Sequence, residues 1–140
     1  MDVVFLIGRI LFGVLFVSSA LMAHLIGYRM GVQYARMYNV PLPELGVPLT
    51  GVVALAGGVM VILGLWGDLG ALLLAAFLLV ITPLMHAFWK ETEEQQKQMQ
   101  MANFNKNLAL LGAALVIFYL WNQLQGDAGL SITDPLFGRG

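Results

Sequence analysis

Four apolar runs separated by short polar connections dominate the pattern of the chain. They cover residues 3–25, 47–66, 69–89 and 108–124, and Arg9 is the only Asp, Glu, Lys or Arg within them. A helix rises about 1.5 Å per residue, so ~20 apolar residues cross the ~30 Å hydrocarbon core of a bilayer. Lipid offers the backbone no hydrogen-bond partner, so each run must form a helix. The pattern predicts an all-α protein, a four-helix transmembrane bundle.

The connections predict additional short helices. Residues 28–39 have a weakly amphipathic pattern that favours an interfacial helix, which Pro41 and Pro43 should end. In the third connection, Thr92 and Gln95 match a capping box, and helical spacing predicts a polar helix running into the fourth apolar run. We therefore expect one domain over 1–125, with short interfacial helices in the first and third connections, and an extramembrane C-terminal tail over 126–140.

Small residues indicate how the helices pack. The second apolar run is rich in glycine, namely Gly51, Gly57, Gly58 and Gly64. Small side chains let membrane helices approach closely, because lipid supplies no hydrophobic drive for association. Gly67-Asp68 is a turn signal, so the second and third helices should be antiparallel neighbours.

The basic residues predict an orientation. Most of them lie in the first and third connections, namely Arg29, Arg36, Lys90, Lys97 and Lys106. The opposite side has Arg9 and Arg139, so the positive-inside rule places connections 26–46 and 90–107 in the cytoplasm and both termini outside. The three tryptophans, which fall near the ends of the runs, are expected to be interfacial anchors: Trp66, Trp89 and Trp121.

Composition excludes several classes of function. The chain has 140 residues, 59% of them hydrophobic, and a net charge of −1 without a basic tract, so we expect no nucleic-acid partner. It has no cysteine, which excludes a thiol active site, a Cys-ligated cluster and a Cys zinc site on this chain. Met99 and Met101 have no His or Cys near them in the sequence to complete a copper set, so we expect no metal site.

Four polar residues are predicted to meet at one membrane surface. His24 ends the first helix, His86 nears the end of the third, and Lys106 with Asn107 opens the fourth. Polar groups at membrane depth suggest a functional site, and a neutral imidazole suits a quinone carbonyl or a quinol hydroxyl. Interfacial anchoring or helix-to-helix hydrogen bonding of the same residues is the favoured interpretation, and a small-molecule or quinone headgroup site comes second. Bis-His haem ligation is the least favoured interpretation, because only one histidine pair exists.

Arg9 is the deepest charge in the predicted bundle. Helical rotation places it on a stripe with Gly13 and His24, which should face the bundle. A structural ion pair with Asp68 or Asp127, both expected on its side, is the favoured interpretation. Anion binding and snorkelling to the headgroups remain as alternatives.

Several motifs resemble the DoxX/DoxD-like family of small four-span membrane proteins. The weaker matches are Gly8-Arg9-Ile10, Asn39-Val40-Pro41-Leu42-Pro43, Gly57-Gly58 with Gly64, and Gly70-Ala71-Leu72-Leu73-Leu74-Ala75. The strongest is His86-Ala87-Phe88-Trp89 followed by Asn103-Phe104-Asn105-Lys106-Asn107-Leu108-Ala109-Leu110. The resemblance covers about residues 3–119, and it implies a four-helix bundle in a prokaryotic cell (inner) membrane. It supplies no accepted catalytic residues.

The resemblance also bears on function. Some relatives are subunits of thiosulfate:quinone oxidoreductases, and others are linked to membrane oxidoreductase complexes. The favoured hypothesis is therefore a non-catalytic accessory or anchor subunit of a larger, quinone-linked redox complex, with the bilayer and a protein complex as partners and quinone as a possible ligand. The alternative is a stand-alone quinone-dependent oxidoreductase of the thiosulfate:quinone type. A small-solute transporter ranks third, because the second and third apolar runs contain no charged residue that would suggest an ion path.

Overall fold

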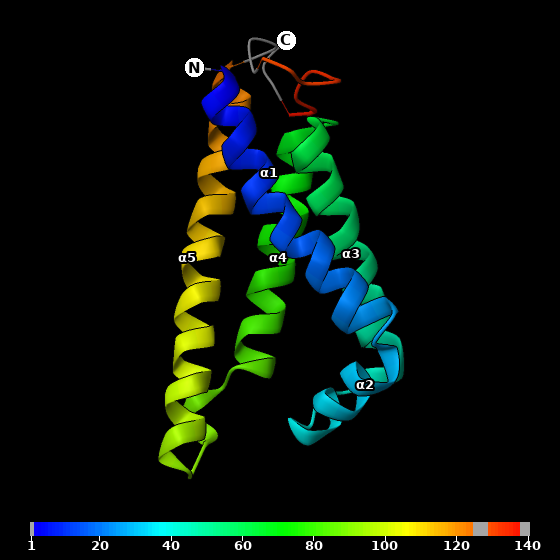
Figure 1. The fold of residues 1–140 in the computed structure, drawn as a ribbon, viewed down its shortest axis with the longest axis vertical. Helices are drawn as coiled ribbons and strands as arrows, with labels where there is room; N and C mark the ends of the chain where they lie inside the picture. Colours follow the sequence, from blue (N-terminus) through cyan, green and yellow to red (C-terminus); the bar gives the residue numbers. More distant parts are fainter. Residues whose placement is uncertain (1, 125–128, 138–140) are drawn as a thin grey trace.

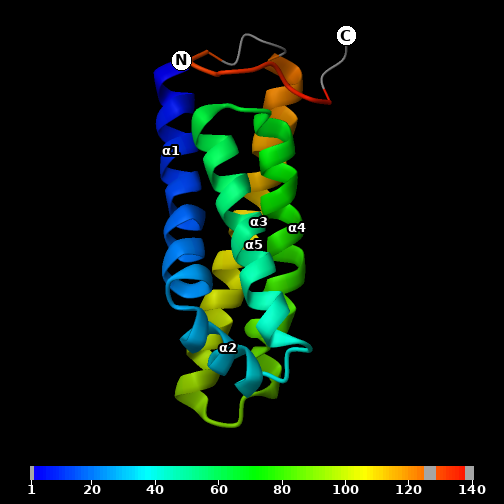
Figure 2. The ribbon, with the colours of Figure 1, turned by 90° about the vertical axis from the view of Figure 1, so that its right-hand side faces the viewer.

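The computed structural model describes residues 2–124 and 129–137. In chain order, these residues form α1 (Asp2–Ser19), the π-helix η1 (Ala20–Leu25), α2 (Tyr28–Met37), α3 (Pro43–Leu63), α4 (Gly67–Met85), the 3₁₀-helix η2 (Phe88–Lys90) and α5 (Glu94–Leu124). No strand occurs in this part of the chain. The four long helices lie side by side, and α2 lies across one end of the bundle (Figures 1 and 2).

The long helices are the expected membrane spans. Over the described residues, four segments are long and apolar enough to cross a bilayer: Asp2–Leu25, Pro43–Leu63, Gly67–Lys90 and Glu94–Leu124. At most 39% of the apolar window of any span is buried inside the protein. Many of the other apolar side chains are exposed on the outside of the bundle, where lipid can cover them. The prediction of an all-α, four-helix transmembrane bundle is confirmed.

The helix boundaries differ in detail from those predicted. The second span already begins at Pro43, because proline is well suited to the first turn of a helix, where its missing N–H is not needed. It ends at Leu63, since Gly64 adopts the left-handed conformation with φ of +69°. The polar helix predicted to run into the fourth apolar run is confirmed, since it forms the first part of α5, and the segment between α4 and α5 contains the short η2.

Glycines bring the backbones together, as the sequence predicted. A Cβ on Gly13 of α1 would lie 2.8 Å from the carbonyl oxygen of Gly58 on α3. A Cβ on Gly57 of α3 would likewise lie 3.0 Å from the carbonyl oxygen of Gly70 on α4. Any larger side chain would separate these helices, so the glycines set the spacing of α1, α3 and α4.

Candidate functional site

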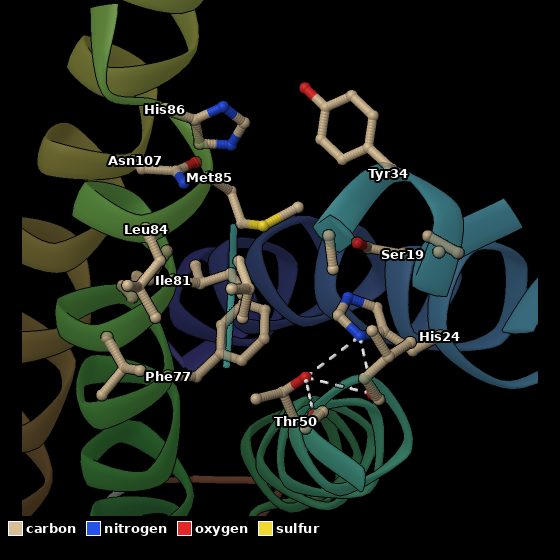
Figure 3. A pocket seen from close by; sticks show the side chains of 18 of the residues that line it. Ser19, His24, Tyr34, Thr50, Phe77, Ile81, Leu84, Met85, His86 and Asn107 are labelled. Atoms are coloured by element: carbon tan, nitrogen blue, oxygen red, sulfur yellow. Dashed lines mark hydrogen bonds between the residues drawn. The ribbon is translucent and has the colours of Figure 1, made fainter. Parts of the chain in front are cut away.

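A cavity of about 410 Å³ opens near the end of the bundle that α2 covers. Its walls come from α1, η1, α2, α3, α4 and α5, and they are mainly apolar, with Phe77, Ile81 and Leu84 on the α4 side (Figure 3). The four polar residues selected from the sequence all line it: His24, His86, Lys106 and Asn107. The fold therefore brings residues that are up to 83 positions apart in the sequence to one mainly apolar cavity, where they supply the polar groups.

His24 reaches the cavity from the π-helix η1. A π-turn adds a residue to the helix and turns side chains to new directions, and such turns are frequent at functional sites. The Nδ1 atom of His24 lies 3.0 Å from the carbonyl oxygen of Val47 and 3.2 Å from the Thr50 hydroxyl oxygen (Figure 3). The edge of its ring packs on Phe77, with 5.9 Å between ring centroids. These contacts fix the orientation of the imidazole.

His86 follows the end of α4 and faces the cavity from another side (Figure 3). Its Nδ1 atom lies 2.8 Å from Oε1 of Gln100, which is only 1% exposed. The Gln100 amide donates to the Tyr34 hydroxyl at 3.0 Å and also to the Tyr38 hydroxyl. This chain of contacts joins α2, α5 and the end of α4. Burial raises the pKa of Tyr38 to about 12, so its phenol stays neutral.

Gln100 and the two tyrosines were not identified as site residues from the sequence. Gln100 lies seven residues before Asn107, so the two share one face of α5. Tyr34 and Tyr38 have the i, i+4 spacing that places two side chains on one helix face. Both spacings are visible in the sequence, but the contact of α2 with α5 depends on the tertiary fold.

Lys106 and Asn107 contribute differently. The Lys106 ammonium is exposed and lies 3.5 Å from Oδ1 of Asn103. Asn107 is 7% exposed, and its side chain forms no hydrogen bond with any described residue. It also lines a neighbouring cavity of about 230 Å³ beside Thr82, whose buried hydroxyl has no partner among the described residues. The Asn107 amide lines both cavities, so it is available to hydrogen-bond a polar ligand there.

The model of the DoxX family matches residues 4–87, from α1 to just beyond α4. The chain belongs to the DoxX family. Neither a curated protein nor a solved structure matches it. Within this DoxX-family chain, the matched region includes Arg9, His24 and His86, whereas Lys106 and Asn107 lie beyond it on α5.

Arg9 of the DoxX domain lies in the first half of α1, beside the last turn of α3, and is 1% exposed. Its guanidinium donates to the Ser131 hydroxyl at 2.8 Å, to the Leu130 carbonyl at 2.9 Å and to the Ile62 carbonyl at 3.2 Å. Within the described part of the chain, no salt bridge joins it to Asp68, and Asp127 lies outside the described residues. Arg9 thus connects α1 to the end of α3 and to the C-terminal segment.

Asp68 binds another part of the C-terminal segment. It is fully buried at the start of α4, and its carboxylate accepts the backbone N–H groups of Leu136 at 2.9 Å and Phe137 at 2.6 Å. The Gly64 carbonyl accepts the backbone N–H groups of Ile132 and Thr133. Residues 129–137 are therefore packed against the bundle, although their sequence predicted only a tail.

Trp121 corrects one expectation about the tryptophans. It is fully buried within the bundle, so its side chain cannot anchor in the headgroup layer. Its ring lies 5.0 Å from the Arg9 guanidinium and 5.3 Å from the Phe5 ring. The indole therefore covers the Arg9 charge inside the bundle, a contact worth about 1 kcal/mol. Position near the end of an apolar run could not reveal this, because the run does not specify which face of the helix is buried.

Proposed function

We propose that this DoxX-family protein is an integral-membrane subunit of a quinone-linked redox complex and that its cavity holds the headgroup of a quinone. The observation that supports the proposal most is the placement of His24, His86, Lys106 and Asn107 around one apolar cavity. Ligand sites have this character, with apolar walls and a few polar groups that orient the ligand. About 410 Å³ accommodates a single substituted ring and the start of its isoprenoid chain.

Quinone chemistry needs a second redox group, and this need supports the proposal that the chain is a subunit of a larger complex. A quinone exchanges electrons with a second redox group, and this chain has no cysteine to hold an iron–sulfur cluster or a reactive thiol. A partner protein would supply that group. In this proposal the bundle binds the quinone in the bilayer, and the partner carries the electrons.

The first test is purification in native lipid without detergent exchange. Mass spectrometry identifies copurifying proteins, and solvent extraction measures the quinone bound per chain. A stoichiometric partner together with bound quinone supports the proposal. Bound quinone on a chain that purifies without a partner and shows quinone-dependent oxidoreductase activity favours the stand-alone oxidoreductase. An isolated chain that carries neither contradicts both.

A matched pair of variants locates the quinone. Lys106→Ala removes an ammonium that lines the cavity, whereas Lys97→Ala removes the same charge from a position on α5 that does not line it. The proposal predicts that only Lys106→Ala lowers the amount of quinone retained. Equal retention in both variants would argue against quinone binding in this cavity.

We also propose that connections 26–46 and 90–107 face the cytoplasm. The proposal rests on the five Lys and Arg residues in these connections. Because the chain has no cysteine, single cysteines introduced at Arg29 and at Thr133 can be labelled without background. An impermeant maleimide added to intact cells should label the second position and not the first. The reverse result would invert the orientation.

A further inference from the structure

Both histidines in the cavity use the same ring nitrogen to contact the protein. Nδ1 of His24 lies against α3, and Nδ1 of His86 lies against Gln100 on α5. In Figure 3 the remaining nitrogen of each ring, Nε2, faces the space between them. A neutral imidazole has one N–H donor and one acceptor nitrogen, so the partner of Nδ1 decides what Nε2 offers to a ligand.

For His24, the partner of Nδ1 is a carbonyl oxygen, which can only accept. The Val47 carbonyl lies 3.0 Å away. The Thr50 hydroxyl also lies near Nδ1, but its one hydrogen has a shorter bond available to the Gly46 carbonyl, at 2.8 Å. Nδ1 therefore carries the proton and donates it to Val47, because an unprotonated nitrogen would face the carbonyl lone pairs. Nε2 of His24 is left as an acceptor.

For His86, the partner of Nδ1 is the side-chain oxygen of Gln100. The Gln100 amide nitrogen is directed to the hydroxyls of Tyr34 and Tyr38, so its two hydrogens are used there. Its oxygen, 2.8 Å from Nδ1 of His86, accepts the imidazole proton. Nε2 of His86 is then also an acceptor. Tyr34 of α2 and Tyr38, which follows the helix, thus determine, through Gln100, which nitrogen of His86 is protonated.

We propose that the cavity offers two unprotonated Nε2 atoms and therefore selects a ligand that donates hydrogen bonds, namely a quinol in preference to the quinone. This inference rests on the proposed function and adds the redox state that the site recognises. A quinol hydroxyl donates to Nε2 and can still accept from Lys106 or Asn107. A quinone carbonyl has only lone pairs, so it would leave both Nε2 atoms unpaired in an apolar cavity.

The tautomers can be measured directly, independently of any activity. The chain has only two histidines, so ¹⁵N-histidine labelling of an untagged or Strep-tagged protein in nanodiscs gives four ring signals. The variants His24→Gln and His86→Gln assign them. We expect a protonated Nδ1 and an unprotonated Nε2 for both rings. Protonation at Nε2 of both rings would overturn the proposal.

Two variants test the causes of each tautomer. Gln100→Leu removes the acceptor for Nδ1 of His86, so His86 should shift toward the Nε2-protonated form while His24 does not change. Thr50→Val removes a hydroxyl near His24 but keeps the Val47 carbonyl, so the His24 tautomer should persist. A His24 tautomer that changes in Thr50→Val would show that the carbonyl does not control it.

The selectivity is tested with three matched ligands, a short-chain alkyl hydroquinone, its quinone and its dimethyl ether, under anaerobic conditions. The dimethyl ether keeps the aromatic ring and both oxygens of the quinol but cannot donate. One or two added hydrogen bonds predict that the hydroquinone binds at least about tenfold more tightly than either of the others. Quinone binding equal to or tighter than hydroquinone binding would refute the selectivity and leave the proposed function standing. If none of the three binds, the proposed function itself fails.

Discussion

Replacing Arg9 by methionine tests how the C-terminal segment is held. Methionine fills a similar volume in α1 but provides no donor. The change removes hydrogen bonds of 2.8 Å to Ser131, 2.9 Å to Leu130 and 3.2 Å to Ile62, together with contacts to the rings of Phe5 and Trp121. The carbonyl of Ile62 lies in the last turn of α3, where helical partners are missing, so Arg9 also caps that helix.

The expected loss can be worked out from these contacts. A net value of about 1 kcal/mol for each of the two shorter hydrogen bonds, and about 1 kcal/mol for the aromatic contacts, gives roughly 3 kcal/mol. The burial of the charge has a desolvation cost that keeps the net value well below the gross strength of these bonds. Arg9→Lys keeps the charge but not the planar fork, so we expect it to lose about half as much.

The assay combines reversible unfolding in bicelles with hydrogen exchange of the C-terminal segment. The backbone N–H groups of Ile132 and Thr133 donate to Gly64, and those of Leu136 and Phe137 donate to Asp68. In Arg9→Met these amides should exchange faster, while amides near α2 keep their rates. Wild-type stability together with wild-type exchange at these four amides would refute the role given to Arg9.

Three further predictions follow from other contacts. Gly67→Ala should destabilise the bundle by about 1–3 kcal/mol in the same unfolding assay, because its Cβ would overlap the Trp121 indole. Gly112→Ala is the control, since a Cβ there meets nothing within 4 Å, and it should not destabilise the bundle. Equal losses of stability in the two variants would contradict this prediction. Asp68→Asn should speed amide exchange at residues 136–137, since the amide replaces one of two carboxylate acceptors; unchanged exchange would speak against the contact. The pKa of Tyr38 is raised to about 12, so the stability that its neutral phenol contributes should be present below pH ~10 and be lost as the pH rises toward 12. Absorbance at 295 nm should show one tyrosine that titrates late, and Tyr38→Phe should remove this late titration. Persistence of the late titration in Tyr38→Phe would refute the assignment.

The membrane spans were predictable because an apolar run of ~20 residues in lipid can satisfy its backbone hydrogen bonds only as a helix. The convergence of His24 and His86 was also predictable, since parallel helices bring their equivalent ends to the same membrane surface. Lys106 and Asn107 begin the fourth span at that level, and the structure places all four residues on one cavity. The function of that cavity stays a prediction.

The parts that the sequence did not reveal depend on contacts between distant segments. Residues 129–137 have no regular pattern, and their place on the bundle is set by Arg9, Gly64 and Asp68, which lie 60 or more positions away. Gln100 lies in a stretch of surface-like glutamines, and only its contacts with α2 and His86 distinguish it. A buried polar residue cannot be identified from its type alone when its partners come from other helices.

Photolabelling with an azido-quinone tests the central claim, that the cavity holds the quinone headgroup, most directly. The full-length protein in native lipid is irradiated, digested and mapped by mass spectrometry, and the label should fall on cavity residues of η1, α2 and α4. Gly46→Phe should abolish it, because a Cβ there has its nearest neighbour at 4.0 Å and the ring would fill the cavity, whereas Gly8→Phe, outside the cavity, should keep it. Labelling spread over the lipid-facing surface, and equal in both variants, would contradict the account.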